Sequence, residues 1–237
     1  MQKIILLIGA VLFIAIAVAQ PNIKLKKKDR RLDVELVTTK GIIVLRLSDA
    51  TPLHRDNFLR LVKAHYYDSL LFHRVIKNFM IQAGDPDSKR ATAGQKLGDG
   101  DLGYTIPAEF DTVLFHQKGA LGAAREGDNV NPEKRSSATQ FYIVQGRKFT
   151  DAGLDSVEIY RLKGRKIPQA QRVVYKSIGG SPHLDQNYTV FGQVVKGLEI
   201  VDAIAAVPTS KGMDKDRPLT NVRLLKARLI KRHHYKN

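Results

Sequence analysis

Apolar and polar side chains alternate along much of the chain from residue 33 onward. Val34 and Leu36 flank Glu35, and a second alternating run follows a turn at residues 39–41. A period of two points successive side chains to opposite faces of a strand, so this pattern predicts a β-hairpin. Further strand-like runs are separated by loops rich in Gly and Asp, and they lie at residues 71–75, 79–83, 120–124, 140–145, 188–194 and 222–230.

Two other segments have helical spacing. Thr51 and Pro52 suit the N-cap and the first position of a helix. The expected buried face of this helix carries Phe58, Leu61, Val62 and His65. Residues 197–207 predict a second helix, which Pro208 ends. Two helices among many short strands predict a mainly β fold, a closed or nearly closed barrel with helical plugs.

Residues 151–180 interrupt this series of strands. Their apolar residues recur at helical spacing, at Leu154, Val157, Tyr160, Ile167, Ala170, Val174 and Ile178. Pro168 suits the start of a helix and Gly179 its end. The segment therefore predicts a helical insertion of roughly 30 residues in a strand-to-strand connection, longer than most loops.

Composition narrows the chemistry. The chain has 237 residues, 43% of them hydrophobic and 26% charged, as in an ordinary globular protein. It contains no cysteine, which excludes disulfides, thiolate zinc sites and thiol nucleophiles. The net charge is +16, but Lys and Arg are spread along the chain and Trp is absent. A soluble basic surface is therefore favoured over specific nucleic-acid binding, which is kept as an alternative together with binding to an anionic surface.

The N-terminus reads as a secretion signal. Residues 4–19 carry no charged or polar side chain, and Ala17-Val18-Ala19 fits the small-x-small rule of signal peptidase. The run is shorter than the roughly 20 residues of a membrane span. We expect a cleaved signal peptide at residues 1–19, a basic linker at 20–30, and a periplasmic or secreted protein with no permanent membrane span. The basic cluster at 24–31 leaves an uncleaved, inverted anchor as the alternative.

Four blocks, taken in order, resemble one known family, the cyclophilins. They are "FHRVIKNFMIQAGD" (72–85), "GALGAAR" (119–125), "SSATQFYIV" (136–144) and "HLDQNYTVFGQVVKGLEIVDAI" (183–204). Several ordered motifs are far more specific than any one alone. The resemblance implies a closed eight-stranded antiparallel β-barrel capped by two helices, spanning residues 31–232 with the insertion at 151–180 and followed by a tail at 233–237. It also implies a peptidyl-prolyl cis-trans isomerase of the exported bacterial type.

Such an enzyme has to lower the barrier to rotation of an amide, which is roughly 18–20 kcal/mol. No bond is broken, so the reaction needs no nucleophile, metal or cofactor, only a donor that favours the twisted amide. The resemblance assigns this catalytic role to Arg74, whose guanidinium stays charged and carries a rigid fork of donors. Taken by itself, Arg74 would more often be half of a surface ion pair.

The resemblance also implies the residues that bind the substrate. Phe79, Met80, Tyr142 and Leu184 would grip the proline ring, although on strands Phe79 and Met80 are more usually core residues. Gln82 would bond the substrate backbone or orient Arg74. The groove for the residue before proline would be lined by Gln140 and by the backbone of Ala124 and Arg125. His73 is either an orienting neighbour or a core polar group. Three positions depart from the best-known members. Tyr188 replaces a His in the proline pocket, and Arg125 stands where Asn is common. His183 replaces a Trp on the pocket rim, which leaves cyclosporin sensitivity open.

The expected partners are proline-containing peptides and unfolded proteins, bound by a monomer that assists folding in the cell envelope. The insertion would form a lobe beside the groove that shapes which polypeptides approach, without taking part in the twisting step. The main alternative is a non-catalytic peptide-binding or chaperone module on the same barrel, with the insertion as its contact surface.

Overall fold

The computed structural model describes residues 23–214 and 216–235. The predicted signal peptide therefore lies outside the described residues. Within the part that is described, none of the helices combines the length and the apolar character needed to cross a membrane.

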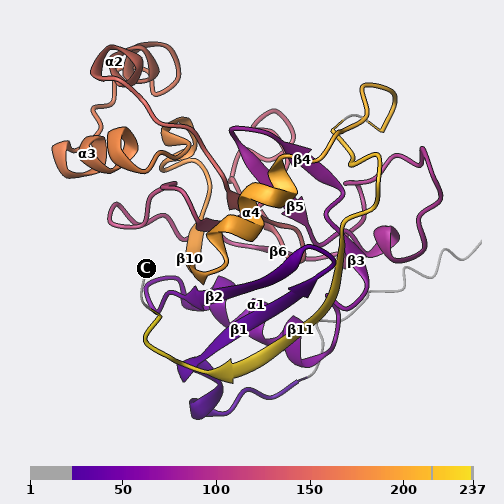
Figure 1. Ribbon diagram of the computed structural model, residues 1–237. Coiled ribbons are helices and arrows are strands. Elements are labelled where there is room, and N and C mark those ends of the chain that lie inside the picture. The colour runs from indigo at the N-terminus through magenta and orange to yellow at the C-terminus, as the bar shows by residue number, and fades with distance from the viewer. Residues whose placement is uncertain (1–22, 215, 236–237) are drawn as a thin grey trace, which may run out of the picture.

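An antiparallel sheet of nine strands forms most of the fold (Figure 1). In spatial order its strands are β3 (Leu70–Leu71), β11 (Arg223–Lys231), β1 (Leu32–Thr38), β2 (Gly41–Leu47), β10 (Val190–Lys196), β7 (Ala120–Ala123), β9 (Phe141–Val144), β5 (Met80–Ala83) and β4 (Arg74–Ile76). A small second sheet pairs β6 (Thr105–Ile106) with β8 (Ser136–Ser137). The mainly β antiparallel fold predicted from the sequence is confirmed.

The two ends of the large sheet belong to one run of chain. β3 and β4 lie at opposite ends of the strand order, yet only Phe72 and His73 separate them. They are the two halves of the strand predicted at 71–75. The first half pairs with β11, with the Phe72 amide still donating to Val222 O (2.9 Å), and the second half pairs with β5. The covalent chain thus brings the sheet ends together. With β3 and β4 taken as one strand, the nine segments become the eight strands of the expected barrel.

Two helices cap the curled sheet, as predicted. α1 (Pro52–Lys63) and α4 (Leu198–Ala205) bury apolar faces in the barrel core, which includes Phe58, Leu61, Val62, Val201 and Ile204. The expectation for His65 is wrong. α1 ends at Lys63 and His65 takes a positive φ of 55°, so its side chain points to solvent and is 67% exposed.

The N-terminus of α1 is capped from a distance. Thr51 occupies the N-cap position, but its buried hydroxyl makes no hydrogen bond within the described residues. The carboxylate of Glu109 instead accepts from the backbone amides of Leu53 (3.0 Å) and His54 (2.9 Å). An anion at this end of a helix is favourable, because the first N–H groups have no partner inside the helix.

The basic segment expected to be a linker is packed on α1 over its described residues. A short 3-10 helix, η1 (Lys27–Arg31), holds Asp29 buried, 2.7 Å from Lys63 Nζ. Arg30 pairs with Asp56 in a two-pronged contact whose shortest distance is 2.6 Å. The tail also makes contacts, since His233 O accepts from Arg46 Nη2 at 3.1 Å.

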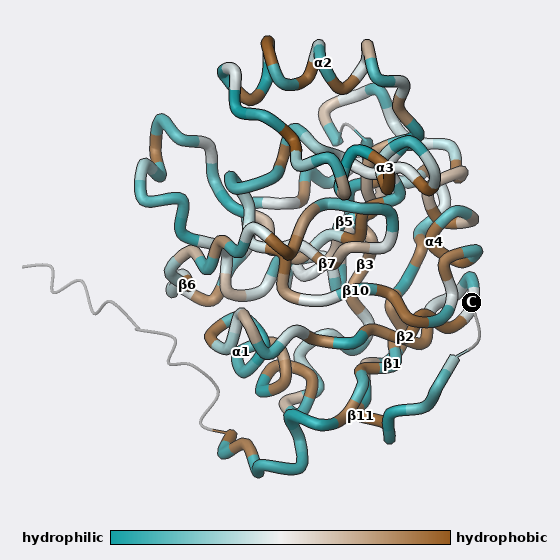
Figure 2. Tube along the Cα trace, turned by 90° about the vertical axis from the view of Figure 1, so that its left-hand side faces the viewer, coloured by the Kyte–Doolittle hydropathy of each residue, from teal (hydrophilic) through white to brown (hydrophobic). Residues whose placement is uncertain are grey.

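The predicted insertion contains two helices, α2 (Asp151–Tyr160) and α3 (Gln169–Ser177). Figures 1 and 2, viewed 90° apart, place them at one end of the molecule with β11 at the other. Their buried faces meet in a separate apolar cluster of Leu154, Leu162, Ile167 and Tyr175. The sequence expectation included Tyr160, Ala170 and Ile178 in this face, and these three are exposed. Tyr175, which was not predicted, is fully buried.

Candidate active site

Four adjacent strands, β4, β5, β9 and β7, carry the predicted site on their outer face. Pair by pair, one row across these strands holds Arg74, Gln82, Tyr142 and Gly122. Residues directly opposite each other share a face, and their neighbours along each strand point the other way. Those neighbours belong to the barrel core, namely Val75, Ile81, Ile143 and Leu121. The pleat therefore separates the barrel interior from a site on its outside.

An apolar cluster of its own covers this outer face. Its buried members are Met80, Ala120, Tyr142, Val144, Leu184 and Val190, and packed against them, partly exposed, are Phe79, Ala124 and Tyr188. The four apolar side chains expected to grip the proline ring, called the proline wall below, all lie in this cluster: Phe79, Met80, Tyr142 and Leu184. Met80 is only 2% exposed, yet it belongs here and not to the barrel core.

Arg74 begins a line of polar contacts at the edge of this cluster. Its Nη1 donates to Gln82 Oε1 (3.2 Å), and Gln82 Nε2 donates to Gln140 Oε1 (3.0 Å). Gln140 Nε2 in turn donates to the carbonyls of Gly98 (2.7 Å) and Gly100 (3.0 Å). Each amide side chain thus accepts on one side and donates on the other, which fixes its orientation. The guanidinium stays 44% exposed, with the Asp216 carboxylate 3.9 Å from Nε.

His73 is 3% exposed, and neither ring nitrogen has a hydrogen-bond partner among the described residues. Burial, assisted by the charge of Arg74 and opposed by Asp85, lowers its pKa to about 4. The imidazole is therefore neutral at neutral pH. His73 lines a cavity of about 240 Å³ together with Arg74, Gln82 and Arg217, and so borders the catalytic candidate.

The groove expected for the residue before proline is a pocket of about 500 Å³ lined by Gln82, Gln140, Ala124 and Arg125. The backbone of Ala124 is already paired inside the protein, since its N–H donates to Gln140 O (3.0 Å) and its carbonyl accepts from Ser137 (2.8 Å). Any bond from substrate to this backbone would have to use the second lone pair of the carbonyl.

The side chain of Arg125 has a position that the sequence did not predict. Its Cζ lies 4.4 Å from the centroid of the Tyr188 ring. Nε donates to Asn187 O (2.8 Å) and Nη1 pairs with Asp128 (2.7 Å), which leaves 4% of the side chain exposed. On the opposite rim the ring of His183 lies 5.4 Å from that of Phe79. Burial lowers the pKa of His183 to about 4, so its imidazole is neutral at neutral pH.

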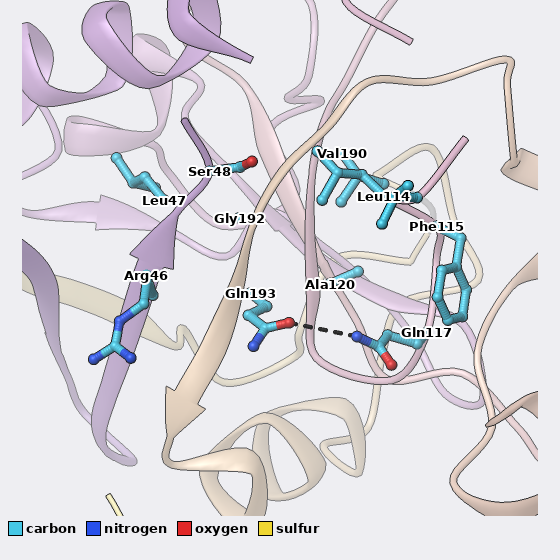
Figure 3. Close-up of a pocket in the computed structure, with 11 residues that line it drawn as sticks. Arg46, Leu47, Ser48, Leu114, Phe115, Gln117, Ala120, Val190, Gly192 and Gln193 are labelled. Atoms are coloured by element: carbon cyan, nitrogen blue, oxygen red, sulfur yellow. Dashed lines mark hydrogen bonds between the residues drawn. The ribbon is translucent and has the colours of Figure 1, made fainter. Parts of the chain in front are cut away.

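A second pocket, of about 320 Å³, lies on the flank between β2, β7 and β10 (Figure 3). Its apolar lining includes Leu47, Leu114 and Phe115, and Gln117 is hydrogen-bonded to Gln193 at 3.4 Å. None of the residues predicted for the site lines it. The candidate active site is therefore the outer-face cluster with Arg74, and not this flank pocket.

Three buried polar residues beneath Tyr142 were missed from the sequence. His116 Nε2 lies 2.8 Å from the Tyr142 hydroxyl, and Nδ1 lies 2.8 Å from the carboxylate of Asp185. Tyr175 of α3 donates to the same carboxylate (2.6 Å). His116 and Asp185 are 69 residues apart, so no local spacing could have connected them. In residues 23–214 and 216–235, no group of three His, Asp or Glu side chains is placed to hold a metal ion.

The geometry of the site agrees with the known proteins to which this chain is similar. Residues 33–229 match the family model described as "Cyclophilin type peptidyl-prolyl cis-trans isomerase/CLD". A protein of Staphylococcus haemolyticus, provisionally named a peptidyl-prolyl cis-trans isomerase, is 32% identical over 203 residues, covering 85% of this chain and 93% of that protein. The chain belongs to the cyclophilin family. This cyclophilin is accordingly an enzyme of the peptidyl-prolyl cis-trans isomerase class.

Two further matches show how much of each protein the similarity covers. A Streptococcus pyogenes protein, provisionally named a bifunctional phosphatase and peptidyl-prolyl isomerase, is 36% identical over 192 residues. This cyclophilin covers only 37% of that protein. A crystal structure of a Cryptosporidium parvum cyclophilin has a TM-score of 0.59 at 20% identity, covering 85% of this chain and 99% of that one. At that identity the likeness shows the fold alone.

Proposed function

We propose that this cyclophilin accelerates cis–trans rotation about X–Pro bonds in polypeptides, with Arg74 as the group that favours the twisted amide. When the amide twists, the proline nitrogen regains its lone pair and becomes an acceptor. The observation that carries the proposal is the placement of a half-exposed guanidinium, oriented by Gln82, at the edge of the outer-face apolar cluster. A donor made rigid before the reaction stabilises the transition state more than the planar ground state.

The proline ring would rest on the apolar wall. Phe79 and Tyr188 are partly exposed, above the buried side chains of Met80, Tyr142 and Leu184. Burial of about three methylenes contributes roughly 2 kcal/mol. A structure of the Cryptosporidium parvum cyclophilin was determined in the presence of the dipeptide Ala-Pro, which supports a short prolyl peptide as the ligand class. The residue before proline would enter the groove beside Gln140.

The enzyme would act on unfolded proteins in the cell envelope. This proposal rests on the apolar run at residues 4–19 and on Ala17 and Ala19, which together suit export and cleavage. N-terminal sequencing of the protein from its source should find a mature chain beginning near Gln20. Protein that stays on the membrane and begins at Met1 would favour the anchor instead.

The test of the catalytic proposal is a prolyl-tetrapeptide isomerisation assay on the mature chain, with Arg74→Ala alongside. We expect the substitution to lower kcat/KM at least a hundredfold, about 2.7 kcal/mol of transition-state stabilisation. The fold should persist, because the guanidinium is 44% exposed and its contact with Asp216 is long. A folded Arg74→Ala protein with near wild-type activity would refute the assigned mechanism.

A further inference from the structure

The hydroxyl of Tyr142 is held from below by a chain of buried hydrogen bonds. It lies 2.8 Å from His116 Nε2, and His116 Nδ1 lies 2.8 Å from Asp185 Oδ1. Tyr175 of α3 donates to Asp185 Oδ2 at 2.6 Å. Tyr142, His116, Asp185 and Tyr175 are each at most 4% exposed. A continuous polar path therefore runs from the proline wall into the insertion.

The protons in this path can be placed. Asp185 as a carboxylate only accepts, so His116 Nδ1 carries its hydrogen toward it, and so does the Tyr175 hydroxyl. With this hydrogen on Nδ1, His116 offers the lone pair of Nε2, which accepts from the Tyr142 hydroxyl. Burial raises the pKa of both tyrosines well above the usual value, so both keep their protons. Every polar atom in the path has a partner, an arrangement that makes a buried network rigid.

The insertion also holds the backbone around His116. Just after α3, the Ser181 amide donates to His116 O (2.8 Å), and Gly179 O accepts from the Lys118 amide (2.9 Å). Arg165, in the turn between α2 and α3, donates to the backbone carbonyl of Asp185 (2.5 Å). The loop fixed in this way also supplies Phe115 and Gln117 to the flank pocket (Figure 3).

The position of the Tyr142 ring over the sheet depends on the groups that it contacts. Its ring lies against Gly122, where a Cβ atom would be 2.3 Å from Tyr142 Cζ. Gly122 has no side chain to hold the ring sideways, so the contact of the hydroxyl with His116 fixes the end of the ring. His116 is in turn oriented by Asp185.

We propose that the insertion is a positioning element for the proline wall, acting through Tyr175, Asp185 and His116 on the ring of Tyr142. The proposal rests on the proposed function, because it gives the proline ring to Tyr142. It assigns Tyr175 and His116 as positioning residues that do not contact the substrate. The insertion would then influence the binding of small prolyl peptides as well. The sequence led us to expect only that it shapes which polypeptides approach the groove.

The test compares Tyr175→Phe with Tyr160→Phe. Both remove one hydroxyl from the insertion, but Tyr160 is 79% exposed. Tyr175→Phe should raise KM for a prolyl tetrapeptide roughly fivefold, at the low end of couplings between sites. Its kcat should change less than about twofold, since contact with the ring is made equally in ground and transition states. Tyr160→Phe should leave both values unchanged.

Two further measurements separate positioning from general loosening. In the Tyr142→Phe background, Tyr175→Phe should add less than about a twofold change, because its effect passes through that hydroxyl. In the otherwise wild-type protein, Tyr175→Phe should shift the imidazole ¹⁵N resonances of His116. An unchanged KM with unmoved resonances, or an equal effect in both backgrounds, overturns the proposal.

The outcomes also distinguish this proposal from the proposed function. A wild-type protein that turns over no prolyl peptide refutes the function, while the His116 resonances still report whether α3 is coupled to Tyr142. If Tyr175→Phe fails to fold, Arg165→Ala replaces it, because that side chain reaches Asp185 from an exposed turn. A higher KM in Arg165→Ala then supports the proposal, and an unchanged KM overturns it.

Discussion

The ring of Tyr142 fits against the sheet because Gly122 has no side chain. The two residues face each other across β7 and β9, and a Cβ atom at Gly122 would lie 2.3 Å from Tyr142 Cζ. Contacts that short do not occur, so a larger residue must displace the ring or bend the strand. Gly122 thereby fixes how closely the Tyr142 ring, which is proposed to bind proline, approaches the sheet, and it does so without contacting a substrate.

Gly122→Ala should consequently weaken peptide binding and spare the chemistry. Overpacking costs about 1–3 kcal/mol, and we expect KM for a prolyl tetrapeptide to rise about tenfold. Arg74 lies on β4, three strands from Gly122 on β7, so kcat should stay within about threefold of wild type.

Gly127→Ala is the matched control, because a Cβ atom there meets only the mobile end of Asn129, at 2.9 Å. The measurement is KM and kcat of both variants and of wild type, obtained from progress curves. A folded Gly122→Ala protein with the KM of wild type would mean that the proline ring does not rest on Tyr142.

At the same scale, the sequence predicted residues that are close along the chain better than residues joined through space. Arg74, Met80 and Gln82 fall in one short block, and the strand pleat places them together on the outer face. His116 and Asp185 belong to the same site, but 69 residues separate them along the chain. Only the packing of α3 against the loop before β7 makes them a pair.

Among the elements, the predictions succeeded where one periodicity governs a whole segment. The hairpin of β1 and β2 was predicted from the alternation around Glu35 and the turn at 39–41, and its register pairs Val34 with Leu45. The strand predicted at 71–75 is instead divided into β3 and β4, because its first half pairs with β11 and its second half with β5. In the insertion, the helical spacing correctly predicted helices and placed Leu154, Val157 and Ile167 on the buried side. It wrongly included Tyr160, Ala170 and Ile178, and it missed Tyr175.

The two helices of the insertion are also joined by a buried charge. Glu158 of α2 is 2% exposed and accepts from Arg172 of α3 (2.8 Å), Lys166 (2.8 Å) and the Ile167 amide (3.1 Å). Glu158→Gln leaves the guanidinium of Arg172 without this carboxylate. Hydrogen bonds to charged groups contribute about 1.5–3 kcal/mol, so α2 and α3 should open more readily by about 2 kcal/mol.

Amide hydrogen exchange measures this opening, as faster exchange in α2 and α3 with little change in β1, β2 and β11. Asp155→Asn is the matched control: Asp155 also contacts Arg172, at 2.9 Å, but it is 57% exposed. Exchange in Glu158→Gln equal to that of wild type would show that the apolar cluster alone joins the helices.

For the molecule as a whole, the buried histidines predict how stability depends on pH. His73 and His183 both have a pKa lowered to about 4, in each case mainly by burial. Unfolded histidines titrate near 6.5, so between pH 6.5 and 4 the unfolded chain binds more protons than the folded one. Stability must then fall as pH falls through this window. For His73 the loss reaches roughly 2 kcal/mol at pH 5 and 3 kcal/mol at pH 4.

Protonation of Asp29, Asp56 and Glu109 cannot account for a loss of stability between pH 6.5 and 5. These carboxylates have lowered pKa values, held down by Lys63, by Arg30 and by His54 against the opposing effect of burial. Their contribution is fully present above the pKa values of unfolded carboxyl groups, about 4, and is lost only below them. The fall between pH 6.5 and 5 therefore belongs to histidine.

Urea unfolding at pH steps from 7.5 to 5 should accordingly show the free energy of unfolding decreasing with acidification in wild type. His73→Gln should flatten this dependence, and adding His183→Gln should flatten it further, whatever each change does to stability at pH 7.5. His65→Gln is the control, because His65 is 67% exposed and should leave the slope as it is in wild type. A His73→Gln protein with the full wild-type slope would show that His73 titrates in the folded barrel as it does in water. The assignment of a neutral imidazole beside Arg74 would then be wrong, because a charged His73 would place a second cation next to the guanidinium proposed to be catalytic.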